Sequence, residues 1–417
     1  MEQSLEIIQA DLAKLQQQTG IVVDKKPIAK GGFSFVFVGS KDKKTLAIKA
    51  TCTKVTTSDE AQTKIKIWTK NDLTVTGNLK NKNCVRCLGI FEFPNSSMIL
   101  QEYAPNKDMS HLTHLFYSCE IFKQVKVKPY KTENSELEKK FNDRYRWYFY
   151  MSESFIRYFF NQITTALFYL RKMSFLHRDI KLENLLLTKT FQVKLTDFAL
   201  STALPSAGVF ELSSAGTSIY MPPECFDPDK KDVLAKEAFK IDYYALGCIL
   251  HKMLFNENVV NVKDKETKRV DFKELSEKLE TMQEKFVHYA DTLKRTNEFT
   301  SKDVQRLLVK LLDKDITKRI DIPEIINNTW TILNEDVIRH IQDIYEYDPY
   351  KFLLELQKMD FIDYYKEKEK LYDLNDSENI DDIEYEIIHI KFNKNNKFPK
   401  RKNIKTFNMN NKLSIIR

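Results

Sequence analysis

Apolar residues recur along this chain with two different spacings, and each spacing predicts a different element. Between residues 155 and 170 they are three or four positions apart, as on one face of a helix: Phe155, Phe159, Ile163, Leu167 and Leu170. Residues 21–50 alternate between apolar and polar side chains, and two short apolar runs at 185–187 and 193–195 flank a turn. We therefore predict a helix over the first stretch and strands over the others.

The first 20 residues carry a second helical pattern. Leu5, Ile8, Leu12 and Leu15 fall at heptad spacing, which predicts a helix with an apolar stripe. Two heptads are too short to establish a coiled coil. We expect this helix to dock on its own domain, and dimerisation is the alternative.

Polar residues surround the two short predicted strands. They are interleaved with apolar ones, which a merely solvated charge run would not be: His177, Arg178, Asp179, Lys181, Asn184 and Asp197. Asn184 and Asp197 carry oxygen ligands of the kind that hold divalent metal, and Asp179 carries a carboxylate that can orient a hydroxyl. Phosphoryl transfer requires these parts.

These residues also carry a resemblance. H-R-D-I-K-L-E-N, residues 177–184, is similar to the catalytic loop of eukaryotic protein kinases, and Asp197-Phe198-Ala199 is similar to their metal-binding D-F-G with alanine in place of glycine. Lys181 is the form found in serine/threonine kinases. Gly216-Thr217 and Met221-Pro222-Pro223-Glu224 resemble the end of the kinase activation segment.

The resemblance implies an α+β, bilobal protein kinase-like fold, with a small β-rich N-lobe and a larger α-helical C-lobe. It implies a serine/threonine protein kinase that uses ATP and Mg²⁺. Asp179 would be the catalytic base, Lys181 would stabilise charge in transfer, and Asn184 and Asp197 would hold the metal.

The nucleotide-binding half of the family pattern lies in residues 28–108. A-K-G-G-F-S-F-V at 29–36 resembles the glycine-rich loop over the phosphates, although Ala29 and Ser34 replace two of its glycines. Leu46-Ala47-Ile48-Lys49 resembles the strand whose lysine holds the α- and β-phosphates. The family pattern places Asp72 as the partner of Lys49, one methylene shorter than the usual glutamate, and Glu60 is a competing candidate.

Residues 101–104 resemble the hinge that hydrogen-bonds adenine through its backbone, with Gln101 as gatekeeper and Asp108 near the ribose. The nucleotide contacts implied by the resemblance are Ile28, Ala29, Lys30, Gly31, Gly32, Phe33, Ser34, Val36, Ala47, Lys49, Asp72, Gln101, Glu102, Ala104, Asp108 and Asp197.

Length and composition suggest the domain organisation. We expect an N-terminal helix at 1–20, a kinase domain at 21–330 (N-lobe 21–104, C-lobe 105–330, insertion about 113–150), a helical extension at 331–372, and a disordered tail at 373–417. The insertion is a candidate docking site for a partner. Within the kinase domain, Asp242 is expected to be buried, Arg319 to pair with Glu224, and Trp330 to close the domain.

Charge and cysteine usage exclude some classes. Residues 391–417 carry nine Lys/Arg and no acid, so the net charge of +7 belongs to a tail and no nucleic-acid partner is expected. Six cysteines without a paired framework suit a reducing compartment, and Cys84-x-x-Cys87 is interpreted as structural in preference to zinc-binding. No stretch is apolar enough for a membrane span, and no secretory signal is seen. We expect a cytoplasmic protein, with Lys400-Arg401-Lys402 left open as a nuclear or lipid address.

Regulation and substrate choice have candidate residues. Ser213 stands where serine/threonine kinases are often phosphorylated, and Arg178 is the residue that would pair with the phosphate. Glu183 and Asp108 favour a basic residue two or three positions before the acceptor, and Leu200 favours serine over threonine. A solvated Glu183 is the alternative.

Two functional classes fit the sequence. The first is an active kinase, supported by Lys49, Asp179, Lys181, Asn184 and Asp197. The second is a pseudokinase, a nucleotide-binding or scaffold module, suggested by Ala199, Asp72 and the depleted glycine loop. Alanine is disfavoured at φ > 0, so Ala199 is expected to make the segment flip less readily to an inactive arrangement.

Overall fold

The computed structural model describes residues 2–54, 58–117, 151–227, 229–260, 272–284, 286 and 300–332, together with 338, 352, 353 and 356. The chain divides into two compact units. Of the described residues, the first unit contains those within 2–108 and 162–245, and the second contains those within 109–161 and 246–356. The catalytic-loop residues therefore share a unit with the N-terminal sheet.

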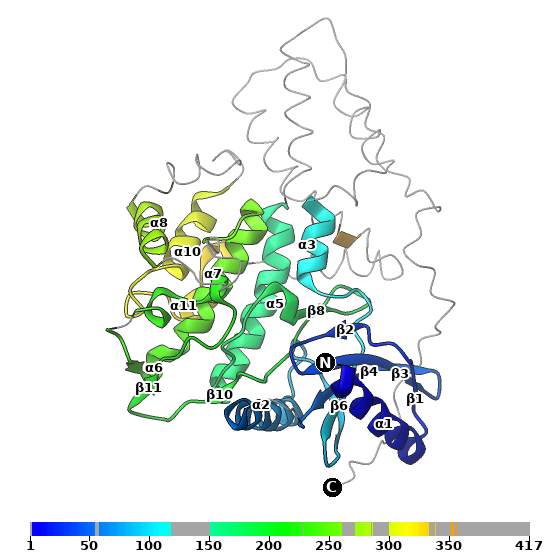
Figure 1. Ribbon diagram of the computed structural model, residues 1–417. Coiled ribbons are helices and arrows are strands. Elements are labelled where there is room, and N and C mark those ends of the chain that lie inside the picture. The colour runs from blue at the N-terminus through cyan, green and yellow to red at the C-terminus, as the bar shows by residue number, and fades with distance from the viewer. Residues whose placement is uncertain are drawn as a thin grey trace, which may run out of the picture. The chain divides into compact units, whose positions relative to one another are not determined.

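An antiparallel sheet dominates the N-terminal part (Figure 1). Its strand order is β1-β3-β4-β6-β5, and β2 pairs with β3. The strands are β1 (Val22–Val23), β2 (Ala29–Lys30), β3 (Ser34–Lys41), β4 (Lys44–Cys52), β5 (Cys87–Glu92) and β6 (Ser96–Glu102). This sheet and the helical C-terminal part confirm the predicted α+β kinase-like fold.

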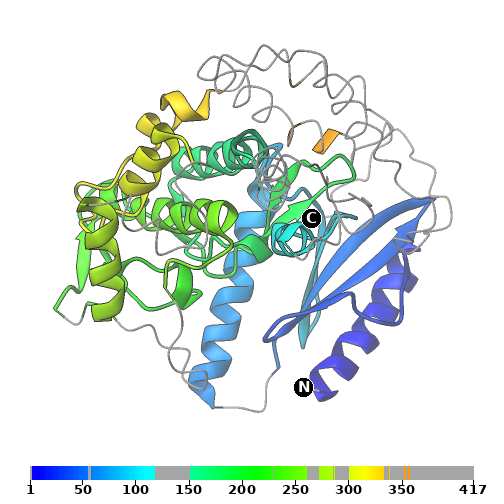
Figure 2. The same cartoon turned by 90° about the horizontal axis from the view of Figure 1, so that it is seen from above.

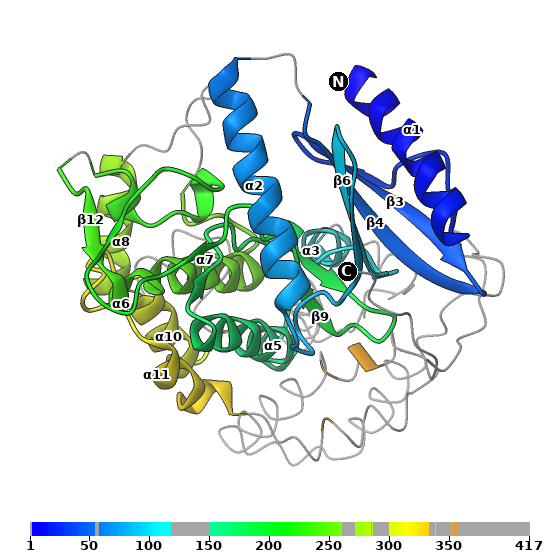
Figure 3. The same cartoon turned by 90° about the horizontal axis from the view of Figure 1, so that it is seen from below.

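Alternation along β4 gives this sheet two different faces. Ile48 and Ala50 belong to an apolar cluster that also contains Ile8 and Leu12 of α1 (Glu2–Thr19), whereas Lys49 points to the opposite face. Figures 2 and 3 show α1 and α2 (Asp59–Asn78) on opposite sides of the sheet. The apolar stripe of α1 is therefore buried against the sheet of its own unit, as expected.

The predicted hairpin is present with the predicted bounds. β8 (Leu185–Leu187) pairs with β9 (Val193–Leu195), and the short helix η1 (Leu182–Asn184) precedes it. β7 (Phe175–Leu176) pairs with β10 (Thr202–Ala203), and β11 (Val209–Glu211) pairs with β12 (Asp232–Leu234). The remaining short elements here are η2 (Ser218–Tyr220), η3 (Pro223–Cys225) and α6 (Ala235–Ala238).

Helices make up the rest of the described chain. They are α3 (Met109–Tyr117), α5 (Glu153–Lys172), α7 (Lys240–Phe255), α8 (Phe272–Glu284), α10 (Lys302–Leu311), α11 (Ile322–Ile326) and η5 (Thr329–Thr331). α5 contains the whole amphipathic pattern of residues 155–170. None of the helices in the described ranges is long and apolar enough to cross a membrane.

Glu153 organises the polar interior of the second unit. Its carboxylate accepts hydrogen bonds from Trp330 Nε1 at 2.6 Å and from Ser301 Oγ at 2.8 Å. Trp330 is buried, which agrees with its predicted structural role. In the predicted extension at 331–372, four described apolar residues are buried, namely Ile338, Phe352, Leu353 and Leu356, and Phe352 lies edge-on to Tyr158.

The predicted insertion at about 113–150 begins inside a helix. α3 runs to Tyr117 with Thr113 buried, so residues 113–117 of the predicted insertion belong to a helix of the body. The rest of the insertion and the tail at 373–417 lie outside the described residues. Glu224 and Arg319 belong to different units, and their pairing stays a prediction.

Candidate active site

Lys49 joins two carboxylates from distant parts of the chain. Its ammonium lies 2.6 Å from Asp72 Oδ2 on α2 and 2.7 Å from Asp197 Oδ1 after β9. Asp72 is buried. Glu60, the competing candidate, is exposed and pairs with Lys64 at 2.6 Å. The structure therefore brings Lys49 together with Asp72, and rejects Glu60.

In this arrangement of one cation and two carboxylates, the pKa values of Lys49 and Asp197 are both shifted. Burial alone would lower the pKa of Lys49, but the charges of Asp72 and Asp197 outweigh it, so this pKa is raised. The ammonium of Lys49 lowers the pKa of Asp197 from 3.8 to about 2, against the opposing effect of burial. Lys49 and Asp197 are therefore both charged at neutral pH.

α2 also holds the D-F-A segment directly. Asp72 Oδ1 accepts from the backbone N–H of Phe198 at 3.1 Å, and Thr76 Oγ1 donates to the same oxygen at 3.1 Å. Asn71 Nδ2 donates to the carbonyl oxygen of Ala199 at 3.5 Å. Neither Asn71 nor Thr76 was among the predicted site residues. The spacing of four residues from Asp72 could have pointed to Thr76, whereas no spacing signal points to Asn71.

The unusual backbone in D-F-A lies at its first residue. Asp197 has φ = 67°, whereas Ala199 is not among the described residues with positive φ. Alanine is therefore unstrained in this arrangement. The predicted difficulty of flipping concerns a second arrangement and stays a prediction.

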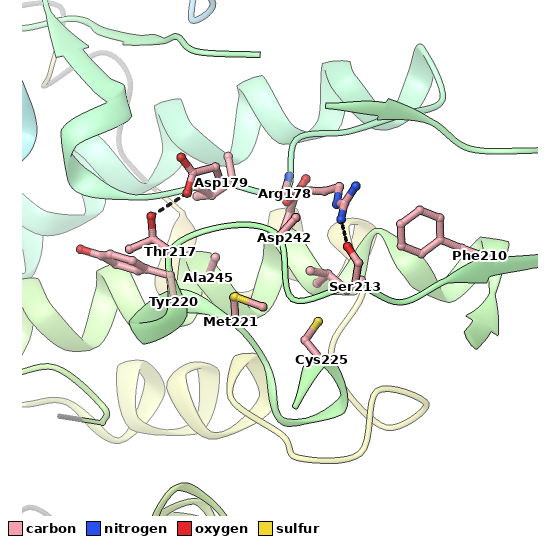
Figure 4. Close-up of a pocket in the computed structure, with 13 residues that line it drawn as sticks. Arg178, Asp179, Phe210, Ser213, Thr217, Tyr220, Met221, Cys225, Asp242 and Ala245 are labelled. Carbon is pink, nitrogen blue, oxygen red and sulfur yellow. Dashed lines mark hydrogen bonds between the residues drawn. The ribbon is translucent and has the colours of Figure 1, made fainter. Parts of the chain in front are cut away.

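Three side chains converge on the carboxylate of Asp179, and Figure 4 shows one of them, Thr217. Thr217 Oγ1 donates to Oδ1 at 2.8 Å, while Lys181 Nζ and Asn184 Nδ2 donate to Oδ2 at 2.6 and 3.1 Å. Lys181 also donates to Thr217 Oγ1 at 3.0 Å. The backbone of Asp179 is held separately, because its N–H donates to His177 Nδ1 at 3.2 Å.

The backbone of the loop is held from below by Asp242. Its carboxylate accepts from the backbone N–H groups of His177 at 2.7 Å and Arg178 at 2.9 Å. Burial raises the pKa of Asp242, and His177 and Arg178 act against that shift. Gly216 passes close by with φ = 130°, and a Cβ there would lie 2.6 Å from the carbonyl oxygen of Arg178. Only glycine fits this position.

The donor set at Asn184 and Asp197 fits a magnesium ion. The backbone N–H of Thr196 donates to the carbonyl of Asn184 at 3.0 Å, so the β8–β9 hairpin brings the two residues close. Asn184 Nδ2 donates to Asp179, so the side-chain oxygen of Asn184 points away from Asp179. Among the hydrogen bonds of the described residues, none reaches this oxygen or Oδ2 of Asp197. Both are hard oxygen ligands of the type magnesium prefers.

One face of the sheet gathers the predicted nucleotide residues. Val36 lies opposite Lys49 in the ladder, and Ala47 lies opposite Gln101, so all four share the face that α2 approaches. Ala29 and Lys30 pair with Val36 and Phe35, which brings residues 28–36 back over β3. Ile28 and Phe33 are exposed there.

The hinge residues are positioned differently from one another. The carboxylate of Glu102 turns to Lys194 at 2.9 Å and to the backbone N–H of Arg86 at 2.8 Å, so this side chain is already engaged on the protein. Asp108 bridges to Leu186 of β8 and is partly buried. Gln101 is buried, as a gatekeeper side chain would be.

The predicted regulatory residues also meet. The guanidinium of Arg178 donates a hydrogen bond from Nη2 to Ser213 Oγ. The same group lies 5.8 Å from the ring centre of Phe210 on β11 (Figure 4). These residues line one small pocket together with Asp179 and Cys225. Ser213 is exposed.

Cys84 and Cys87 are both free cysteines. Cys84 is buried, which raises the pKa of its thiol to about 12. No cluster of three or more metal-binding His, Cys, Asp or Glu side chains exists in the part of the chain that the structure describes. The structural interpretation of this pair stays a prediction.

A family model for the protein kinase domain matches residues 22–331. The chain is 26% identical to an Aurora kinase of Schizosaccharomyces pombe over 311 residues, 75% of this chain and 71% of the relative. It is 25% identical to an Aurora kinase of Debaryomyces hansenii over 272 residues, 64% of this chain and 52% of the relative. A shorter match of 93 residues, at 36% identity, joins 22% of this chain to 20% of the serine/threonine-protein kinase cds1 of S. pombe. The chain thus spans about half of one Aurora relative and a fifth of the last.

Proposed function

This chain belongs to the protein kinase family, and we propose that it is an active serine/threonine kinase that transfers the γ-phosphate of ATP to a protein hydroxyl. The observation that carries the proposal is the set of contacts around Asp179. Thr217, Lys181 and Asn184 hold its carboxylate from three directions within 3.1 Å. A module that only bound nucleotide would not need this arrangement.

The sheet face supplies the nucleotide site in this proposal. Val36 and Ala47 present small apolar side chains to the adenine, and Lys49 holds the α- and β-phosphates. The charges of Asp72 and Asp197 keep Lys49 protonated, as the direction of its pKa shift requires. Asp72 thus serves binding indirectly, by fixing the position of the lysine.

Asn184 and Asp197 would hold magnesium through their side-chain oxygens. When bound, the metal neutralises charge on the phosphates and helps to align them for transfer. The low pKa of Asp197 keeps its carboxylate ionised throughout the neutral range. Lys49 supports this state with its 2.7 Å contact.

Asp179 orients the acceptor hydroxyl and takes its proton. The hydroxyl oxygen attacks the γ-phosphorus, the bond to the β-phosphate oxygen breaks, and ADP leaves. Lys181 lies 2.6 Å from Asp179 and would stabilise the negative charge on the transferred group. Thr217 fixes the rotation of the Asp179 carboxylate, so that one oxygen faces the acceptor.

The alternative is a pseudokinase that binds nucleotide or acts as a scaffold. Its support is the glycine-poor loop and the substitutions at residues 72 and 199. The 2.6 Å contact of Asp72 with Lys49 and the unstrained backbone of Ala199 weaken two of these arguments. We therefore favour activity.

We also propose a substrate preference. Glu183 is exposed in η1, four residues after Asp179, and can meet a basic residue two or three positions before the acceptor. Leu200 follows the D-F-A segment and favours serine over threonine. A positional-scanning peptide array decides between this and a solvated Glu183: the preference should weaken in Glu183→Ala, and an unchanged preference refutes it.

Place and partners are proposed on sequence alone. A cytoplasmic location suits the cysteine usage, and the nucleus stays open because of Lys400-Arg401-Lys402. Residues 118–150 remain the candidate docking segment. No nucleic-acid partner is expected.

The activity is tested by incubating purified protein with Mg²⁺-ATP and a serine substrate, beside Asp179→Asn. Wild type should form phosphoserine, and the variant should be slower by about 10²–10⁴, since it lacks a general base. Circular dichroism of both proteins controls for folding. A folded wild-type protein that binds nucleotide but forms no phosphoserine establishes the alternative.

A further inference from the structure

We propose that Trp68 is a positioning residue for the phosphate-binding loop, which it holds through Phe33. This inference rests on the proposed nucleotide site at residues 28–36. It concerns a side chain of α2 that touches neither the lysine nor the metal ligands. By holding this loop, Trp68 would act on the bound nucleotide, whose phosphates lie beneath the loop.

The contact joins the tip of the loop to a helix. The ring centres of Phe33 and Trp68 are 6.4 Å apart with planes tilted by 39°, within the range of attractive aromatic pairs. Phe33 is 39% exposed, so the aromatic contact and one backbone hydrogen bond, from Cys52 N–H to its carbonyl, account for its position. Without Trp68 the side chain would have little to hold it.

The loop has lost some of the flexibility of a glycine-rich sequence. Ala29 and Ser34 stand in place of glycines, and the N–H of Gly31 donates to the carbonyl of Ser34 at 2.8 Å to close a tight turn. A stiff turn moves as one piece when its tip is held. Fixing Phe33 therefore fixes the backbone N–H groups that would face the phosphates.

Trp68 occupies the same face of α2 as Asp72. The two residues are four apart, so they lie one above the other on the helix (Figure 3 shows α2 along the sheet). Asp72 pairs with Lys49, and Asn71 reaches Ala199. One face of α2 thus holds the loop, the lysine and the D-F-A segment together.

This arrangement predicts a specific kinetic effect. Loss of the Trp68 ring frees the loop but leaves Asp179, Lys181 and Thr217 in place. Nucleotide affinity should fall, while the rate at saturating nucleotide changes little. A movement of α2 would release the loop and the lysine at the same time.

The first experiment measures Mg²⁺-ATP affinity and transfer kinetics. Trp68→Ala should raise Kd and KM for ATP by about five- to ten-fold with kcat within two-fold, and Trp68→Phe should restore most of the affinity. Ile67→Ala, on the neighbouring exposed residue, is the matched control and should behave as wild type. Equal affinity in Trp68→Ala and wild type overturns the inference.

A double mutant tests the contact itself. Phe33→Ala and Trp68→Ala should each weaken binding, and the double mutant should be no weaker than the worse single variant. Additive effects would show that the two rings act separately, and would overturn the inference.

A third measurement needs no nucleotide. Phe33→Ala should make the fluorescence of Trp68 more accessible to acrylamide, and the difference should vanish in a Trp68→Phe background; equal quenching overturns the contact. If wild type binds ATP but transfers no phosphate, the proposed activity fails and this inference stands. If wild type binds no ATP, both fail.

Discussion

Lys49 and Asp72 form a buried ion pair of 2.6 Å although the acid is one methylene shorter than the glutamate usual in protein kinases. The second oxygen of Asp72 is also used, by the N–H of Phe198 and the hydroxyl of Thr76. The short side chain therefore binds the lysine and the D-F-A backbone at once. A shorter acid is compatible with an intact site when α2 lies close to both.

Replacing this carboxylate by an amide should reduce transfer. Asp72→Asn keeps the shape but removes the charge that orients Lys49, so we expect the rate at subsaturating ATP to fall about ten- to hundred-fold. The protein should still fold, because Lys49 keeps Asp197 as a partner. Asp72→Glu is the control that keeps the charge, and it should retain more activity than Asp72→Asn. Higher activity in Asp72→Asn than in Asp72→Glu would contradict the assigned role.

Lys49→Met should remove transfer altogether.

Ala199 is expected to affect inhibitors more than catalysis. Its backbone is unstrained here, but alanine is disfavoured wherever the segment must adopt φ > 0. Ala199→Gly should tighten binding of inhibitors that require a flipped-out Phe198, by about two- to five-fold for a relief of about 0.5–1 kcal/mol. Inhibitor dissociation constants check this. Tight binding of such inhibitors to the natural protein speaks against it.

Ser213 should have a modest regulatory effect. A phosphate there would meet Arg178, whose guanidinium already contacts the hydroxyl. Burial lowers the pKa of Arg178, and an anion would compensate for that desolvation. The effect should stay small, because Arg178 is the one basic side chain that contacts Ser213 among the described residues. Ser213→Ala should lower activity less than ten-fold, and mass spectrometry should find the phosphate in active protein; unmodified Ser213 and Ser214 would remove the proposal.

His251 should make stability depend on pH. Its pKa is lowered from 6.5 to about 4, mainly by burial and to a smaller extent by Lys278 and Lys252, against the opposing effect of a hydrogen bond to the carbonyl of Glu257. The folded state thus favours neutral imidazole, so this stability is complete above pH 6.5 and is lost as pH falls towards 4. Between pH 7 and pH 5 the loss is roughly 2 kcal/mol.

The control is His251→Phe, which cannot titrate. Its free energy of unfolding, measured by denaturant at pH 7 and pH 5, should fall less than that of wild type over this interval. Parallel losses in both proteins would mean that other groups set the pH dependence.

Much of the site could be predicted from local sequence patterns. The contacts between distant segments could not be predicted in this way. The hairpin at 185–195 and the polar loop before it are contiguous, so their residues could be read directly. The family pattern predicts Asp72 as the partner of Lys49. The hydrogen bond that Asp72 accepts from the N–H of Phe198 spans 126 residues and leaves no periodic signal. The same holds for Phe33 with Trp68, and for the pairing of β11 with β12. The positive φ of Asp197 depends on tertiary contacts and could not be inferred from residue type.

The most direct test of the account compares phosphate transfer by wild type and Asp197→Asn at saturating Mg²⁺-ATP, with nucleotide binding and circular dichroism measured on the same samples. Wild type should phosphorylate a serine peptide, and Asp197→Asn should stay folded but transfer phosphate at least about 10²-fold more slowly, because it lacks a charged metal ligand. Equal rates in the two proteins, or a wild type that binds Mg²⁺-ATP and transfers nothing, would contradict the account.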